Sequence, residues 1–196
     1  IGENGAGKTT LMNILGGVLR PDAGVIELDG KRVEFASPRD SLAAGIAFIH
    51  QELNLVNDLN VYENLFLGRE RVRGAFTDTA RMREEARAVL ERMGMALDPC
   101  AMVRDLDASY KQVVEIARAL LFDARVIIMD EPTTSLTEPE IERVFSMMRT
   151  VKEQGVSIVF ISHKLREVLE ICDTYTVLRD GVNVAAGATR ETTEAE

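Results

Sequence analysis

The sequence predicts an α/β fold with a mostly parallel sheet, an inserted helical lobe and a small antiparallel β portion. Three observations predict it. Helix and strand patterns alternate over 1–60 and 122–196, which we assign to one α/β body. Between them, over 61–121, apolar residues recur at helical spacing with charged residues on the other face, which indicates a helical lobe. Two short alternating stretches surround an Asp-Gly pair, as antiparallel hairpins do.

The first part of the body begins with a helix and a hairpin. The helix is predicted to end at Gly16-Gly17, and a second helix to begin at Ser37-Pro38, where a capping residue precedes proline. The predicted ranges are 8–15 for the first helix, 25–28 and 32–35 for the hairpin strands, and 46–49 for a short apolar strand.

The second part of the body returns to buried strands. Between them a helix is predicted to begin at a capping box of Thr137 and Glu140. Polar residues from Thr189 onward are expected to fray. The predicted ranges are 126–129 and 156–161 for parallel strands, and 175–178 and 182–185 for a closing hairpin.

Composition excludes several classes of protein. A length of 196 residues with 46% hydrophobic content is enough for one sizeable core. The net charge of −9 argues against a nucleic-acid partner. Cys100 and Cys172 are too few and too far apart for a disulfide scaffold, and no apolar run reaches the roughly eighteen residues of a membrane span. Because the first motif starts directly after Ile1, we expect a fragment.

The strongest motif is G-x-x-x-x-G-K-[ST] at 2–9, which is typical of a P-loop NTPase. Its glycines let backbone N–H groups surround phosphates at a helix N-terminus. Lys8 would reach the β and γ phosphates of ATP, and Thr9 would bind Mg²⁺. The alternative is a glycine-rich turn that only caps a helix. The candidate nucleotide-binding residues are Gly2, Glu3, Asn4, Gly5, Ala6, Gly7, Lys8, Thr9 and Thr10.

Two acidic residues follow the buried strand at 126–129, at the edge of an α/β sheet where ligands bind. Asp130 would hold the metal, and Glu131 would polarise the attacking water, a step in which a positioned base contributes about 10²–10⁴-fold. Taken alone, Asp-Glu-Pro is more typical of a helix-capping turn. Because the same chain also contains the phosphate loop, we favour the catalytic interpretation.

Gln51 and His163 each follow a predicted strand, so we expect them at the same edge. The Gln51 amide could reach metal or water, and the His163 imidazole could reach a γ-phosphate. The alternatives are a solvated loop amide for Gln51 and an ordinary surface residue, after an N-cap at Ser162, for His163. His50 is interpreted as a surface residue only.

The order of these motifs resembles the nucleotide-binding subunits of ABC transporters. The phosphate loop, Gln51, the helical lobe, Asp130-Glu131 and His163 stand in the places of Walker A, the Q-loop, the signature lobe, Walker B and the switch histidine. Segments that look like those of ribose, galactose and xylose importers lie at 49–55, 63–70, 114–120 and 135–137.

The resemblance implies that Mg·ATP binding and hydrolysis power the import of a sugar, with this chain as the first of two cassettes. Implied partners are a second cassette, in the same chain or a dimer, transmembrane permease subunits near Gln51 and 63–67, and indirectly a sugar-binding protein. The implied location is the cytoplasmic face of the cell membrane, as a peripheral protein. The strands that open such a cassette, with the aromatic that stacks on adenine, are expected to be missing.

One stretch departs from the family pattern. Where the family has the signature LSGGQ, this chain has Leu106, Asp107, Ala108, Ser109 and Tyr110. The family's signature serine donates to the γ-phosphate bound by the other cassette. A carboxylate about 4 Å from a phosphate oxygen costs on the order of 4 kcal/mol at an effective dielectric constant of about 20, whereas a helix N-terminus returns about 0.3–1 kcal/mol.

The departure from the signature leaves two interpretations open. Asp107 would repel the phosphate, and only one of the two composite sites would hydrolyse ATP well. Alternatively, Ser109 would start a capping box for the next helix, with Asp107 merely solvated.

Two other functions would also use the motifs. A non-transport ABC ATPase acting on ribosomes or DNA is disfavoured by the net charge. A regulatory cassette with impaired hydrolysis fits the degenerate signature, but Glu131 argues against it, because a pure binder needs no carboxylate beside the metal ligand.

Overall fold

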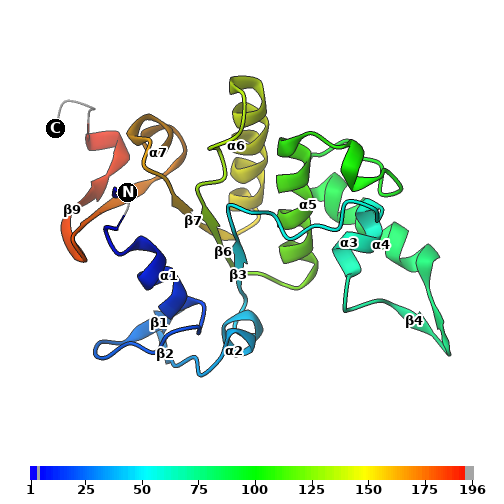
Figure 1. Ribbon diagram of the computed structural model, residues 1–196, viewed down its shortest axis with the longest axis horizontal. Helices are drawn as coiled ribbons and strands as arrows, with labels where there is room; N and C mark the ends of the chain where they lie inside the picture. Colours follow the sequence, from blue (N-terminus) through cyan, green and yellow to red (C-terminus); the bar gives the residue numbers. More distant parts are fainter. Residues whose placement is uncertain (4, 193–196) are drawn as a thin grey trace.

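The computed structural model describes residues 1–3 and 5–192, and a parallel sheet lies at its centre (Figure 1). The strands of this sheet are β3 (Ile46–Ile49), β6 (Val126–Asp130) and β7 (Ser157–Ile161), in the order β3-β6-β7. All run parallel, so their carboxyl ends lie at one edge. The predicted α/β class and these three strands are confirmed.

The two faces of the sheet pack against different layers because side chains alternate along a strand. Ile127 and Met129, on β6, belong to a core cluster with Phe145, whereas Ile128 belongs to a second cluster with Met12. Figure 1 shows α1 on one side of the strands and α5 on the other.

Three helices of the body begin where the sequence predicts them, whereas the helix after His163 begins at Leu165, with Lys164 and not the expected Ser162 as its N-cap. Ser37 precedes α2 with Pro38 in its first position, and Thr137 and Glu140 form the capping box of α6. The bounds are α1 (Lys8–Leu15), α2 (Pro38–Ala43), α6 (Glu138–Glu153) and α7 (Leu165–Ile171).

Residues 61–121 hold mainly helices that share the larger core cluster with the sheet. The elements are α3 (Val61–Phe66), β4 (Val72–Arg73), β5 (Phe76–Thr77), α4 (Thr79–Arg92), η1 (Val103–Asp105) and α5 (Ala108–Leu121). The β4–β5 hairpin was not expected, because strands of two residues are too short for a period-2 pattern. Among the described residues, no helix has the length and apolarity that a bilayer crossing requires.

Two antiparallel hairpins complete the fold, as predicted. In each, an aspartate and a glycine with positive φ form the turn: Asp29 and Gly30 in the first, Asp180 and Gly181 in the second. The strands are β1 (Ile26–Leu28), β2 (Lys31–Val33), β8 (Thr174–Arg179) and β9 (Val182–Ala188).

The expected fraying from Thr189 is wrong over 189–192. A short helix, η2 (Thr189–Glu191), follows β9, and the Thr189 hydroxyl donates to the Cys172 carbonyl at 2.6 Å. The rest of that prediction, 193–196, lies outside the described residues.

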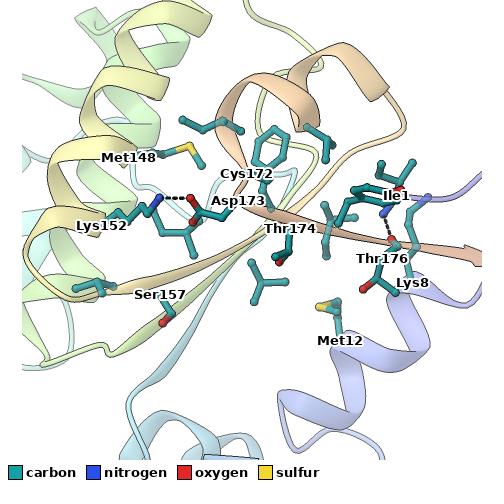
Figure 2. A pocket seen from close by; sticks show the side chains of 18 of the residues that line it. Ile1, Lys8, Met12, Met148, Lys152, Ser157, Cys172, Asp173, Thr174 and Thr176 are labelled. Carbon is teal, nitrogen blue, oxygen red and sulfur yellow. Dashed lines mark hydrogen bonds and ion pairs between the residues drawn. The ribbon is translucent and has the colours of Figure 1, made fainter. Parts of the chain in front are cut away.

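A cavity of about 740 Å³ lies between β7, β8 and α1. Figure 2 shows Met12 and Lys8 at one end of it, where the Ile1 amino group donates to the Thr176 carbonyl at 2.8 Å. At the other end Lys152 pairs with Asp173 at 2.6 Å. None of the acidic residues predicted to act on ATP lines this cavity.

Candidate active site

The phosphate loop depends on glycines. Gly7 precedes α1 with φ 93° and Gly5 has φ 85°, a left-handed backbone that disfavours other residues. A Cβ on Gly2 would lie 2.5 Å from the Leu178 carbonyl oxygen, so the loop also packs too closely for a side chain there. Asn4 lies outside the described residues.

The N-terminus of α1 is suited to an anion. Its first turn, Lys8, Thr9 and Thr10, contains no acidic residue, and within the described part of the chain no side chain caps it. The backbone N–H groups of this turn, with the helix dipole, therefore favour negative charge. Lys8 Nζ contacts the Gly2 carbonyl and lies 3.1 Å from the Glu3 carbonyl, so the ammonium group is held over the loop.

Glu131 has a strained backbone directly after β6. Its φ is 47°, a conformation that costs about 1–3 kcal/mol in a residue other than glycine. The strand holds it there, because the Glu131 N–H donates to the Ile161 carbonyl at 2.9 Å. Strain of this kind gathers at functional sites, which supports the predicted role of Glu131.

The side chain of Glu131 meets His163. Oε1 lies 3.0 Å from His163 Nδ1, and Oε2 accepts a hydrogen bond from the Thr134 hydroxyl at 3.3 Å. The hydrogen bond from His163 is the main reason that the pKa of Glu131 lies below its usual value, against the opposing effect of burial. Since a carboxylate can only accept, Nδ1 carries a proton. Glu131 is therefore an ionised acceptor, the state that a general base needs.

The pKa of Asp130, the last residue of β6, is shifted in the opposite direction. Burial and the neighbouring charge of Glu131 raise the pKa of Asp130, and the charges of Lys8 and His50 partly offset this. A nearby cation would stabilise the charged form of this carboxylate, so Asp130 fits the predicted role of metal ligand. Its interaction with Lys8 brings the phosphate loop and the end of β6 to one place.

Gln51 lies exposed just after β3, the strand that pairs with β6. The same strand end carries His50, whose ring stacks on Phe48 with centroids 5.9 Å apart. The effect of His50 on the pKa of Asp130 was not predicted from the sequence. Its place after β3, beside Gln51, was the signal that could have revealed it.

The stretch that departs from the family signature has a defined structure at the start of α5. Asp107 is the N-cap of α5: it accepts from the Tyr110 N–H at 2.9 Å and from the Ser109 hydroxyl at 2.7 Å. Its other oxygen pairs with Arg143 of α6 at 2.9 Å, and that guanidinium lies 4.5 Å from the centroid of the Tyr110 ring. Burial would raise the pKa of Asp107, but these three hydrogen bonds outweigh it and lower the pKa.

One interpretation of this stretch is wrong. Ser109 does not begin a capping box, because it is already buried in the first turn of α5, and Asp107 is not merely solvated. Helix α5 begins two residues earlier than that interpretation required, because an aspartate is as good an N-cap as a serine. Leu106 and Ala108 flank the cap on either side.

Solved structures of ABC transporter cassettes share the fold of this chain. An ATP-binding cassette of an ABC transporter in its ADP conformation superposes with a TM-score of 0.83, at 27% identity over 97% of this chain and 79% of that one. The structure of cbiO1 from Clostridium perfringens, described as part of the ABC transporter complex cbiONQ, gives a TM-score of 0.83 at 26% identity over 97% of this chain and 76% of that one.

Sequence relatives are import proteins. The ribose import ATP-binding protein RbsA of Chromobacterium violaceum is 55% identical over 92% of this chain and 36% of its own length. That of Bacillus licheniformis is 49% identical over 94% and 38%. The chain thus spans little more than a third of the curated relatives. A sequence profile described as ABC transporter matches residues 1–134. The chain belongs to the ABC transporter family.

Proposed function

We propose that this chain binds and hydrolyses ATP with Mg²⁺, and that the hydrolysis powers import of a monosaccharide through an ABC transporter. The observation that carries the proposal is the ionised Glu131, held by His163 at the carboxyl end of β6 beside Asp130. The sugar-import names of relatives that are 49% and 55% identical support the cargo class.

The residues fit a magnesium ion that arrives with the nucleotide. The proposed ligands Thr9, Gln51 and Asp130 offer only oxygen donors of the kind that Mg²⁺ prefers. Across 1–3 and 5–192, no three His, Cys, Asp or Glu side chains gather into a ready-made cage. Mg²⁺ is commonly held by one or two carboxylates together with the phosphates of the substrate, whose charge it neutralises.

The geometry supports the remaining proposed roles. The N–H groups of the loop and Lys8 bind the phosphates, which positions the γ-phosphate at the start of α1. Glu131 accepts a proton from the attacking water. His163, with its Nδ1–H bonded to Glu131, orients that carboxylate, and when its ring is protonated Nε2 would also donate to the γ-phosphate.

Replacing Glu131 with Gln tests the hydrolytic role. In the full-length protein at saturating Mg·ATP, Glu131→Gln should lower turnover by about 10²-fold or more while nucleotide still binds, because the amide keeps the shape and loses the base. The exposed Glu153, at the end of α6, provides the control: Glu153→Gln should leave turnover unchanged. Equal, negligible turnover in wild type and Glu131→Gln would instead favour a regulatory cassette with impaired hydrolysis.

We also propose that the cassette pairs asymmetrically with a second one. In the ABC transporter cassettes that this chain resembles, the signature serine donates a hydrogen bond to the phosphate held by the partner cassette. Here the corresponding carboxylate of Asp107 takes the hydrogen bonds at the start of α5 for itself. The composite site that this loop completes should be the weaker of the two. This same feature favours, as a second candidate, the regulatory cassette.

A further inference from the structure

A buried polar cluster lies just behind the Glu131–His163 pair. Its members are Thr133, Ser162 and Glu167, which are 1%, 2% and 8% exposed, together with the half-buried ammonium group of Lys164. The proposed hydrolysis does not use any of these residues. Polar side chains this deeply buried are costly unless every group is paired, so the arrangement calls for an explanation.

Glu167 is the centre of the cluster. Its Oε2 accepts hydrogen bonds from the Thr133 hydroxyl at 2.6 Å and from the Ser162 hydroxyl at 3.4 Å. Its Oε1 lies 2.9 Å from Lys164 Nζ. The Ser162 oxygen in turn accepts from the Lys164 N–H at 3.0 Å, so the hydroxyl both donates and accepts.

These contacts join two loops that carry the site. Thr133 follows Glu131 by two residues in the segment after β6, whereas Ser162 and Lys164 are the two chain neighbours of His163 after β7. One carboxylate on α7 therefore binds the side chains of both neighbours of His163 and also that of Thr133, in the loop of Glu131. Lys164 Nζ, 3.4 Å from the Thr133 carbonyl, closes the same ring.

We propose that Glu167 is a positioning residue of the hydrolysis site: by bonding Thr133, Ser162 and Lys164, it fixes the separation of the two loops and so keeps His163 Nδ1 against Glu131 Oε1. Its effect is transmitted through His163, which is half exposed and has no burial of its own to hold its ring in place. The proposal rests on the roles proposed above for Glu131 and His163.

The ring nitrogens of His163 report this effect directly. In the full-length protein with ¹⁵N-labelled histidine, the neutral ring of His163, identified by its loss in His163→Gln, should carry its proton on Nδ1. Glu167→Gln keeps the shape of the side chain but loses the ion pair with Lys164. In this variant both tautomers of His163 should appear. ATP turnover should fall about tenfold, as for other residues that orient a functional group, with KM for ATP little changed.

Two further variants keep the test sharp. Glu170→Gln changes the same chemical group on the same helix, where Glu170 faces Arg149 at 3.4 Å, and it should leave turnover and the tautomer unchanged. Thr133→Val removes one hydroxyl but keeps the Glu167–Lys164 pair. If Glu167→Gln does not fold, Thr133→Val should show the same changes in smaller degree.

A double-mutant cycle separates positioning from general stabilisation. In a His163→Gln background, Glu167→Gln should cost no more than about twofold in turnover, because the residue through which it acts is gone. The proposal is overturned if the tautomer is unchanged in Glu167→Gln and the loss of turnover is the same in both backgrounds. If Glu131→Gln and His163→Gln themselves turn over like wild type, the proposed function fails, while the tautomer still decides what Glu167 does.

Discussion

At the scale of single residues, the site depends on contrasting electrostatics for two adjacent carboxylates. Asp130 has a raised pKa, chiefly because it is buried, and Glu131 has a lowered pKa, chiefly because His163 donates to it. The two groups are thereby suited to different tasks, since one gains from a cation and the other stays ionised as an acceptor. The neighbouring positions in the sequence do not reveal this difference.

The hydrogen bond between His163 and Glu131 should make stability depend on pH. Because the pKa of Glu131 is lower in the folded than in the unfolded state, the bond contributes stability above the unfolded pKa and loses it as pH falls through the folded pKa. We expect His163→Gln to lower the free energy of unfolding by about 1 kcal/mol at neutral pH, a small value because the ring is half exposed.

Urea unfolding of wild type and His163→Gln across acidic and neutral pH measures this effect. The difference between the two proteins should shrink as pH falls below 4.5, the ordinary pKa of the side chain. A difference that stays constant down to the most acidic pH would show that Glu131 does not depend on His163 for its ionisation.

At the scale of elements, the start of α5 is the feature that departs most from the family. Asp107 caps the helix, and Arg143 from α6 forms an ion pair with it across 36 residues of sequence. A cap and an ion pair together stabilise the loop in one conformation. The same contacts fill the helix N-terminus with the protein's own carboxylate, so a phosphate from a partner cassette meets negative charge there.

Restoring a serine at this position should raise the activity of the transporter. Asp107→Ser keeps a good N-cap, so α5 should fold unchanged, while the repulsion on the order of 4 kcal/mol at close approach disappears. We expect a large gain in ATP turnover of the intact transporter. Arg143→Gln, which removes only the partner and leaves the carboxylate, should give no gain. Unchanged turnover in Asp107→Ser would remove the asymmetric pairing.

At the scale of the whole molecule, the helices of 61–121 and the sheet share one core, so the lobe packs directly against β3 and β6. Most of 61–66 is buried within that core. The surface near Gln51 that a permease could contact is therefore formed by exposed residues on either side, Glu52, Val56 and Leu67. This is where we place the docking of the transmembrane partner.

A cysteine crosslinking scan in membranes tests that placement. Cysteines at Glu52, Val56 and Leu67 of the full-length protein should crosslink to a permease subunit, and a cysteine at the exposed Glu153 should not. Replacing the exposed Cys100 with Ser removes the reactive thiol within this chain, because burial raises the pKa of Cys172 to about 11 and keeps that thiol unreactive at neutral pH. Absence of any membrane partner at all three positions would contradict the proposed location.

The sequence by itself determined the features that depend on neighbours along the chain. The phosphate loop, the bounds of α1, the caps of α2 and α6, and the Asp-Gly hairpins follow from local spacing and turn chemistry, and the structure has them where they were predicted. The alternation of apolar strands and helices also determined the α/β class. A two-residue hairpin such as β4–β5 escaped, because no period can be read from so few residues.

Only the tertiary structure decided which side chains meet. His163 reaches Glu131 because β6 and β7 are adjacent and parallel, and Asp107 meets Arg143 because α5 packs on α6. The hydrogen bond between Thr133, in the loop after β6, and Glu167, on α7, likewise joins residues 34 positions apart. Such contacts depend on the register of the strands and the packing of the helices. Many sequences with the same local pattern could bring different side chains together in the same fold. Motifs therefore named the candidate residues, whereas packing decided their charge, their orientation and their partners.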